Sequence, residues 1–134
     1  MTLYKAVRPD GTDFRTGTIN YSNIGTLVKH PHPTRGHEDP SHYISTSTEP
    51  GDCTGFVWPA RLFEVTAYGK PWIPHVWDLP NKRAVTGVRT VRELPAWQVF
   101  GPQGEAVVAI LDGFSTLLNK TELYYARGDG WHTA

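Results

Sequence analysis

A run of hydroxyl side chains follows a histidine and a tyrosine in the segment Ser41-His42-Tyr43-Ile44-Ser45-Thr46-Ser47-Thr48. Hydroxyl groups donate and accept hydrogen bonds, so side chains of this kind can hold a polar ligand. The same residue types suit a β-strand, in which alternate side chains face opposite sides of a sheet. Two interpretations stay open: the hydroxyls line a ligand site, or they cover an exposed face of a sheet.

Four histidines lie upstream of or within this run, at His30, His32, His37 and His42. The sequence His30-Pro31-His32 resembles a metal clip. A metal site needs ligands at a spacing that an element of regular structure sets, together with further Cys or carboxylate ligands. Prolines break this segment and no such ligands accompany it, so we expect ordinary loop histidines and no metal site.

Motifs of covalent and phosphate chemistry are absent. The chain has no Gly-x-Ser-x-Gly turn for a hydrolase serine and no glycine-rich phosphate or dinucleotide loop. Cys53 is the only cysteine, which excludes an intrachain disulfide and a zinc–cysteine cluster. No motif therefore decides the function by itself.

Length and charge limit the function classes. The 134 residues fit a single domain spanning 1–134, with 13 basic and 13 acidic side chains. A balanced charge argues against nucleic-acid binding, although a local basic group occurs at Lys82, Arg83, Arg89 and Arg92. The chain start lacks the apolar region of a signal peptide and no stretch is long enough to cross a membrane. We expect a cytoplasmic protein without membrane association.

Strands must position the hydroxyl run. Alternating apolar residues predict strands over 3–8, 42–48 and 60–68, and a weaker pattern predicts a strand over 14–21. Ser22 is a weak cap candidate for a short helix within 20–28. The prolines of 30–40 and 69–81 predict loops, the second packed by Trp72 and Trp77.

The second half of the chain is less regular. Residues 84–94 fit a strand with a bulge at Gly87 better than a helix, and 97–100 fit a short strand after Pro95. Residues 106–118 are apolar nearly all round and form either a strand and a helix or one buried helix. The tail over 123–134 is expected to be frayed. These elements predict a strand-dominated α+β fold.

The order of three segments resembles that of ADP-ribosyltransferase folds, in particular the small rifampin-modifying branch. The segments are Leu3-Tyr4-Lys5-Ala6, His42-Tyr43-Ile44-Ser45-Thr46-Ser47 and Arg61-Leu62-Phe63-Glu64-Val65. The likeness covers about half the chain, in short pieces. It implies two small antiparallel sheets around a cleft, one or two short helices, and NAD bound in the cleft as the substrate of a mono-ADP-ribosyltransferase.

The resemblance also implies which residues hold NAD. A cation of the first strand would bind the dinucleotide, and the Ser-Thr-Ser strand would form the floor of the site. By position these residues are Tyr4, Lys5, Arg8, His42, Tyr43, Ser45, Thr46 and Ser47. Lys5 lies between Leu3 and Val7 on an apolar strand face, where a lysine is costly unless it meets an anion.

No acidic residue lies at the position that the family pattern gives to the catalytic carboxylate. The Glu-x-Glu motif is missing, and Glu93 lies one residue from the expected position, which Arg92 occupies. A shift of one residue points a strand side chain to the opposite face. Glu93 and Glu64 are the two candidates for the acid.

A second resemblance spans most of the chain. The segments Arg8-Pro9-Asp10-Gly11-Thr12-Asp13-Phe14, Arg61-Leu62-Phe63-Glu64-Val65 and Val91-Arg92-Glu93-Leu94-Pro95 resemble an uncharacterised family of small proteins, many from actinobacterial phages. This likeness implies a phage accessory protein in the cytoplasm of the host cell. The alternative to an enzyme is then a non-catalytic protein that binds a host protein through the loop of Trp72 and Trp77, since tryptophan is a favoured interface anchor.

Overall fold

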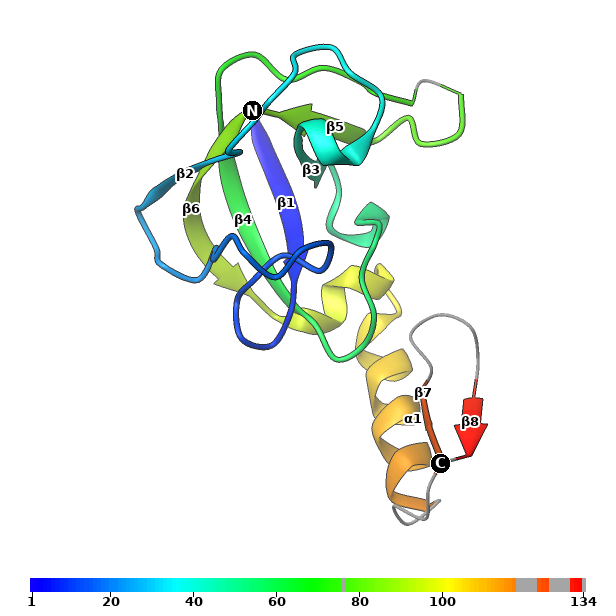
Figure 1. Ribbon diagram of the computed structural model, residues 1–134. Helices are drawn as coiled ribbons and strands as arrows, with labels where there is room; N and C mark the ends of the chain where they lie inside the picture. The colour runs from blue at the N-terminus through cyan, green and yellow to red at the C-terminus, as the bar shows by residue number, and fades with distance from the viewer. Residues whose placement is uncertain (76, 118–122, 126–130, 134) are drawn as a thin grey trace.

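One sheet of six antiparallel strands forms the main body of the molecule (Figure 1). The computed structural model describes residues 1–75, 77–117, 123–125 and 131–133. Across the sheet the strands follow the order β2-β6-β4-β1-β3-β5. Their bounds are β1 Thr2–Val7, β2 Leu27–Lys29, β3 Ile44–Ser47, β4 Arg61–Tyr68, β5 Lys82–Val85 and β6 Gly87–Leu94.

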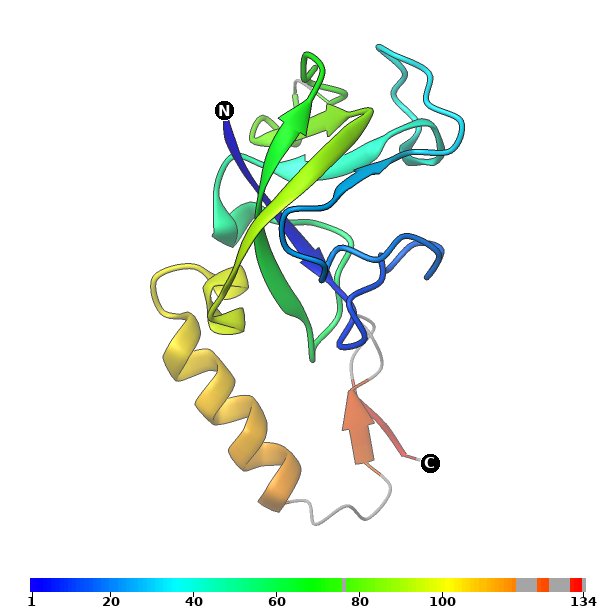
Figure 2. The same cartoon turned by 90° about the vertical axis from the view of Figure 1, so that its left-hand side faces the viewer.

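Short helices and one long helix complete the described elements. The 3-10 helices are η1 Pro40–His42, η2 Pro50–Asp52 and η3 Ala96–Phe100, and the α-helix is α1 Gly104–Leu117. Figure 2 shows α1 running away from the six-stranded sheet. Beyond α1, β7 Leu123–Tyr125 pairs with β8 Trp131–Thr133. The expectation of a frayed tail over 123–134 falls partly on residues 126–130 and 134, which lie outside the described residues.

The sheet curls because β5 and β6, which are separated by a single residue in the chain, pair with different strands far apart in the sheet. β5 lies at the edge of the sheet and pairs with β3, whereas β6 lies between β2 and β4, yet only Thr86 separates β5 from β6. The sheet must bend to bring these two positions together. A Cβ on Gly87 would lie 2.9 Å from the carbonyl oxygen of Val28, so a glycine allows β2 to approach at this point.

Apolar side chains cover both faces of the sheet. On one face the buried cluster consists of Leu3, Val7, Tyr21, Ile44, Phe63, Val65, Val85 and Val88. On the other face Ala6, Leu62 and Val99 pack with partly buried residues that include Trp58 and Phe100. Successive strand residues point to opposite faces, so the alternation in β1 and β4 produces both clusters. Each fully buried large side chain contributes about 1.5–3 kcal/mol to the free energy of unfolding.

Several sequence expectations are confirmed. The predicted strands over 3–8, 42–48 and 60–68 correspond to β1, β3 and β4, and the described residues of 69–81 form a loop. Of its two tryptophans, which were both expected to pack, Trp72 is half-buried and Trp77 is 96% exposed. The strand-rich α+β class is also confirmed, with one helix of regular α type among the described residues. Two sheets around a cleft are not confirmed, because the strands expected to form them all belong to the same sheet.

The segment between β1 and β2 was predicted incorrectly. A strand over 14–21 is absent, and only an isolated bridge joins Thr12 to Asn20. The Asp13 carboxylate binds backbone N–H groups of this segment, which favours a turn over a strand ladder. A helix within 20–28 is also wrong, since Ser22 bonds back to Asn20 and β2 begins at Leu27.

Two further expectations need correction. Residues 97–100 belong to η3 and not to a strand, with backbone hydrogen bonds from Gln98 to Pro95 and from Gly101 to Gln98. Gly87 begins β6 and is not the bulge. The predicted strand does contain a bulge, but at Val91 of β6, which stays unpaired because Glu64 pairs with Arg92 and Val65 with Thr90. The bulge position depends on pairing with β4, whereas η3 forms through local hydrogen bonds after Pro95.

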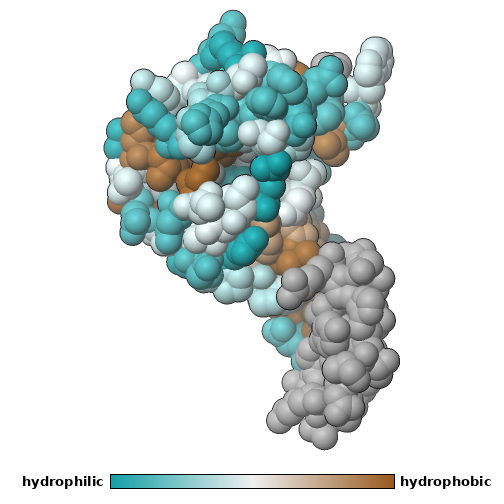
Figure 3. All heavy atoms as spheres, viewed as in Figure 1, coloured by the Kyte–Doolittle hydropathy of each residue, from teal (hydrophilic) through white to brown (hydrophobic). Residues whose placement is uncertain are grey.

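The helix expected within 106–118 is α1, although Leu118 lies outside the described residues. The helix is not buried: Ile110 keeps 69% of its surface exposed. In the described part of the chain no helix is long and apolar enough to cross a membrane. Hydrophilic residues cover most of the coloured surface in Figure 3, with apolar residues in separate patches.

Candidate functional site

Lys5 fills a gap between two strands. β1 and β3 pair at Tyr4 and Ser47, and no further register pair joins them in the described chain. The carbonyl group of Ser45 therefore remains free of strand pairing to β1. The Lys5 ammonium donates a hydrogen bond to this carbonyl oxygen over 2.9 Å. The same ammonium lies 5.4 Å from the centre of the Tyr21 ring, within range of a cation–π interaction.

A cavity of about 90 Å³ opens beside Lys5. Residues from β1, β3 and three loops line it: Lys5, Asp13, Arg15, Thr16, Thr18, Ile19, Tyr21, His30, Pro31, Pro40, Tyr43, Ile44 and Ser45. Burial lowers the pKa of Lys5 from 10.5 to about 8, although the charge of Asp13 acts in the opposite direction. An ammonium at this place is thus desolvated and still largely charged at pH 7.

Asp13 holds one wall of the cavity in place. Its carboxylate accepts hydrogen bonds from the backbone N–H groups of Thr16, Thr18 and Ile19 and from the Thr16 hydroxyl, at 2.7–3.0 Å. Burial alone would raise the pKa of Asp13, but these hydrogen bonds outweigh it and lower the pKa. The carboxylate is therefore an ionised anchor of the turn and is already supplied with donors.

Two tyrosines complete the apolar part of the lining. Tyr21 is 1% exposed, and burial together with the charge of Asp13 raises the pKa of its hydroxyl. Tyr43 is also buried, and its hydroxyl donates to the carbonyl oxygen of Glu38 over 3.1 Å. Burial raises the pKa of Tyr43 to about 12. Both phenols are protonated donors near neutral pH.

The hydroxyl run does not present one surface. Ser47 faces the same side of the sheet as its partner Tyr4, and its hydroxyl bonds the backbone of Glu49. The Thr46 hydroxyl donates to the carbonyl oxygen of Arg83 on the neighbouring strand. Ser45 alone among the three lines the cavity beside Lys5. Ser45 therefore belongs to the cavity, whereas the hydroxyl groups of Thr46 and Ser47 form structural hydrogen bonds.

The other proposed dinucleotide residues lie elsewhere. Tyr4 packs in the cluster on the opposite face from Lys5. Arg8 donates to the carbonyl oxygen of Phe14 and lines a separate groove with Trp58. His42 stacks on His37 with ring centres 3.9 Å apart. The cavity of about 90 Å³ thus gathers Lys5, Tyr43 and Ser45 from the proposed set. A smaller pocket of about 10 Å³ is lined by Tyr4 and Thr46 together with Lys5 and Ser45. The remaining members of the set line neither pocket: Arg8, His42 and Ser47.

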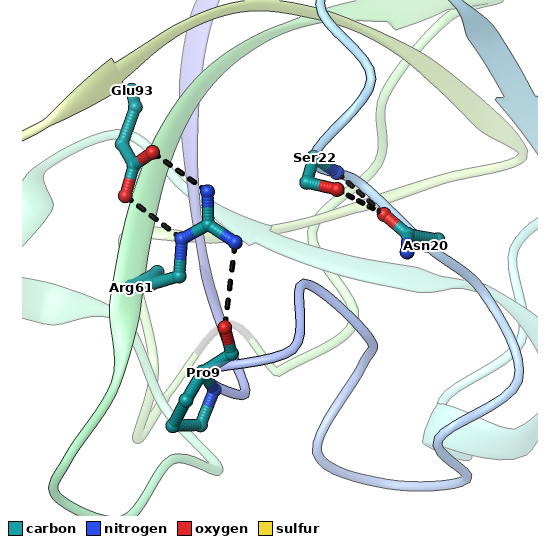
Figure 4. Close-up of polar contacts among 5 residues, drawn as sticks. All are labelled: Pro9, Asn20, Ser22, Arg61 and Glu93. Carbon is teal, nitrogen blue, oxygen red and sulfur yellow. Dashed lines mark hydrogen bonds and ion pairs between the residues drawn. The ribbon is translucent and has the colours of Figure 1, made fainter.

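Both candidate acids form ion pairs with arginines. The Glu93 carboxylate binds the Arg61 guanidinium through two contacts of 2.8 and 2.9 Å (Figure 4). Glu93 lies two strands from Lys5 on the same face, with Phe63 between them, which corresponds to about 10 Å between backbones. Glu64 lies on the other face, paired with Arg92 at 2.8 Å. Neither carboxylate lines the cavity of Lys5.

The loop between β4 and β5 carries the second candidate surface. Its Trp72 is half-buried, donates its indole N–H to the carbonyl oxygen of His37 over 3.1 Å, and meets the Tyr43 ring edge-on. Trp77 in contrast is 96% exposed, and Ile73 is 42% exposed. In Figure 1 this loop projects from the upper right of the molecule. The two tryptophans thus have different roles.

An open groove of about 550 Å³ lies beside this loop. Its lining comprises Gly36, His37, Glu38, Asp39, Pro40 and His75. Two carboxylates of this lining, Glu38 and Asp39, are exposed, and Asp78 follows Trp77 in the chain. The groove and the exposed indole belong to the same loop through His75 and Trp77, and the two carboxylates of the groove suit a cationic ligand.

The histidines of 30–42 serve the loop itself. The His30 and His37 side chains accept hydrogen bonds from the N–H groups of His32 and Asp39, and His42 bonds the Thr34 hydroxyl. Among the described residues, no group of three or more His, Cys, Asp and Glu side chains is arranged to hold a metal ion.

The sequence did not indicate Asp13 or Tyr21 as site residues and indicated His30 only as part of a His-Pro-His clip, although all three line the cavity. The spacing Asp13-x-x-Thr16-x-Thr18 is a signal of an Asx-type turn that could have identified the first. No local pattern places Tyr21 or His30 at this cavity, because folding alone brings them to β1.

No family model, curated protein or solved structure matches this chain. The cavity beside Lys5 and the Trp77 loop are therefore the two features of the molecule that bear on its function.

Proposed function

We propose that the chain is a small accessory protein that binds a partner protein through Trp77. The observation that carries this proposal is the 96% exposure of the Trp77 indole. Tryptophan is enriched among the residues that dominate binding energy at protein interfaces. If the chain is encoded by a phage, as its resemblance implies, the partner is a host protein.

The base of the loop is organised before binding. Trp72 and Ala84 exchange two backbone hydrogen bonds of 3.0 and 2.8 Å, and the Asn81 amide bonds the Asp52 carboxylate over 2.7 Å. A loop held in one conformation loses less entropy when a partner orders it. This arrangement supports Trp77 as a presented anchor and Trp72 as the residue that holds the loop.

The charges around Trp77 favour a particular kind of partner. Glu38 and Asp39 line a groove that His75 of the same loop also lines, and Asp78 follows Trp77 in the chain. The cation Arg35 is directed to Trp72, 5.8 Å from its ring centre. Complementary charge assists encounter and orientation of two proteins. The partner segment would thus carry Lys or Arg side chains beside an apolar residue.

A photo-crosslinking amino acid at Ile73, an exposed residue of the same loop that leaves Trp77 in place, tests this function in host lysate, with the same group at Tyr68, an exposed aromatic residue of β4, as the control. We expect a specific crosslinked protein from position 73 that is absent from position 68. Trp77→Ala should abolish capture of that protein by the tagged chain. Equal capture by Trp77→Ala and the unchanged protein would contradict the proposal.

A second candidate function is NAD-dependent ADP-ribosyl transfer. The observation that favours it is the convergence of Lys5, Tyr43 and Ser45 on one cavity. It requires Glu93 or Glu64 to leave its arginine, and it requires the cavity to widen, since ligand pockets usually span roughly 300–1,000 Å³. Incubation with labelled NAD and host lysate, together with thermal melting in NAD, tests it. Absence of both transferred label and a melting shift would eliminate this candidate.

A further inference from the structure

The half-buried Lys5 has no ion-pair partner in the described chain. The ion pairs there are Arg61–Glu93 and Arg92–Glu64, so no carboxylate of the described residues lies within 4.0 Å of Lys5 Nζ. Besides its hydrogen bond to the Ser45 carbonyl oxygen and its contact with the Tyr21 ring, the ammonium can donate a further hydrogen bond. Buried charges in proteins are normally paired and hydrogen-bonded.

Tyr21 offers a second donor without a partner. The residue is 1% exposed and lines the same cavity as Lys5. No hydrogen bond joins its hydroxyl to another residue of the described chain, while the equivalent group of Tyr43 bonds Glu38. Among the described residues the fully enclosed side-chain oxygen without a partner is Thr90 Oγ1 and not Tyr21 Oη, so the Tyr21 hydroxyl keeps contact with solvent and is accessible to a ligand.

Asp13 is not the ion-pair partner that Lys5 lacks. Its two oxygens accept four hydrogen bonds from Thr16, Thr18 and Ile19, and the carboxylate lies beyond ion-pair distance of Lys5. Arg15 also lines the cavity. Two cations therefore face one carboxylate that is already satisfied, and the cavity has an excess of positive charge and of free donors.

We propose that this cavity binds a compact oxyanion, whose oxygens accept hydrogen bonds from Lys5 Nζ and Tyr21 Oη. The volume of about 90 Å³ is smaller than an engineered cavity of about 150 Å³ that holds benzene. It suits inorganic phosphate or a short carboxylate and is too small for a nucleotide. The site is thus distinct from the Trp77 surface and does not depend on NAD binding.

The test is an NMR titration of the full chain with sodium phosphate and, separately, sodium acetate, at pH 7 and constant ionic strength. We expect saturable shifts of the backbone amide signals of Thr16, Thr18 and Ile19, which surround Asp13 at the cavity wall. Saturation by one anion alone identifies phosphate or carboxylate as the ligand class. Shifts that grow linearly with both salts would overturn the proposal.

Three variants assign the response to the cavity. Lys5→Met should abolish saturation, and Tyr21→Phe should weaken affinity roughly tenfold, as expected for a lost hydrogen bond to an anion. Lys29→Met removes a lysine that lies over Tyr68 outside the cavity, so it should bind as the unchanged protein does. If Lys5→Met does not fold, Tyr21→Phe decides: unchanged affinity in that variant contradicts the proposal. Saturation by NAD without any response to phosphate or acetate would also contradict it and would favour the second candidate function.

Discussion

Asp13 shows how much one side chain organises in this protein. The carboxylate supports a turn between β1 and β2 through four hydrogen bonds and shapes the cavity beside Lys5. Hydrogen bonds to charged groups contribute about 1.5–3 kcal/mol each, and they are not additive. The turn is therefore expected to be sensitive to the charge of this one residue.

Asp13→Asn should lower the free energy of unfolding by roughly 2–4 kcal/mol in urea denaturation, because a neutral amide oxygen cannot serve all four donors. The lowered pKa of Asp13 implies a pH dependence of the same sign: its stabilisation is present above the pKa of the unfolded chain and is lost as the pH falls through the folded value. Asp10→Asn, which changes an exposed carboxylate near Thr12, is the matched control and should cost less. Equal losses in the two variants would contradict this role.

The lowered pKa of Lys5 predicts that the free energy of unfolding rises with pH. Its pKa is about 8 when folded and 10.5 ordinarily, so the unfolded chain binds more protons between these values. Solvent reaches the half-buried side chain and screens its charge, so the gain in the free energy of unfolding should stay below about 3 kcal/mol. Urea denaturation between pH 7.5 and 9.5 measures the rise.

The matched variant is Lys5→Met, in which this rise should disappear. Tyr21 and Cys53, whose pKa values burial raises, oppose the trend at higher pH, and Asp13 and Lys82 also face Lys5. All four groups are shared by the two proteins, so the difference between their pH profiles reports Lys5. Parallel profiles would show that the ammonium is not desolvated in the folded chain.

At the scale of elements, the junction of η3 and α1 depends on Gly104. A Cβ at this position would overlap the carbonyl oxygen of Trp97 and lie 2.8 Å from its carbonyl carbon. The glycine therefore allows the backbone of η3 to approach the first turn of α1. A larger residue would force the two helices apart.

Gly104→Ala should lower the melting temperature, with a loss of roughly 1–3 kcal/mol for an overpacked contact. Gly113→Ala is the control within the same helix, where a Cβ meets nothing within 4 Å. That substitution should raise helix stability by about 0.5–1 kcal/mol. A melting temperature that Gly104→Ala leaves unchanged or raises would show that the two helices do not touch at this point.

At the scale of the whole molecule, the curled sheet brings two distant loops together. The partner change at Thr86 places β5 beside β3, and Trp72 of the β4–β5 loop then reaches His37 and Tyr43 of the loop before β3. The wall of the Lys5 cavity and the base of the Trp77 loop thus share Tyr43.

Trp72→Ala should cost roughly 3–5 kcal/mol, the range for deleting a large aromatic side chain from a packed site, reduced in proportion to its partial exposure. Trp77→Ala should change the free energy of unfolding by no more than about 0.5 kcal/mol, because its side chain is 96% exposed. Chemical denaturation of both variants measures the contrast. Similar losses would mean that Trp77 packs against the protein.

The alternation of apolar and polar residues was enough to predict much of the sheet. The alternation in β1 and β4 identified the strands and their faces, including the placement of Lys5 on the apolar face, because side-chain direction in a strand has a period of two. It failed between β1 and β2, where the Asp13 carboxylate takes the N–H groups that a strand needs, and at 97–100, where a 3-10 helix follows Pro95.

The amino-acid sequence by itself determined a strand-rich α+β domain, a proline-rich loop that carries Trp72 and Trp77, and a lysine in an apolar setting. Only the tertiary structure decided that Lys5, Asp13 and Tyr21 surround one cavity and that Glu64 and Glu93 lie outside it, paired with arginines. The physical reason is that strand order and sheet curvature arise from contacts between distant segments. Local residue patterns specify which face a side chain occupies, but not which strand or loop will face it.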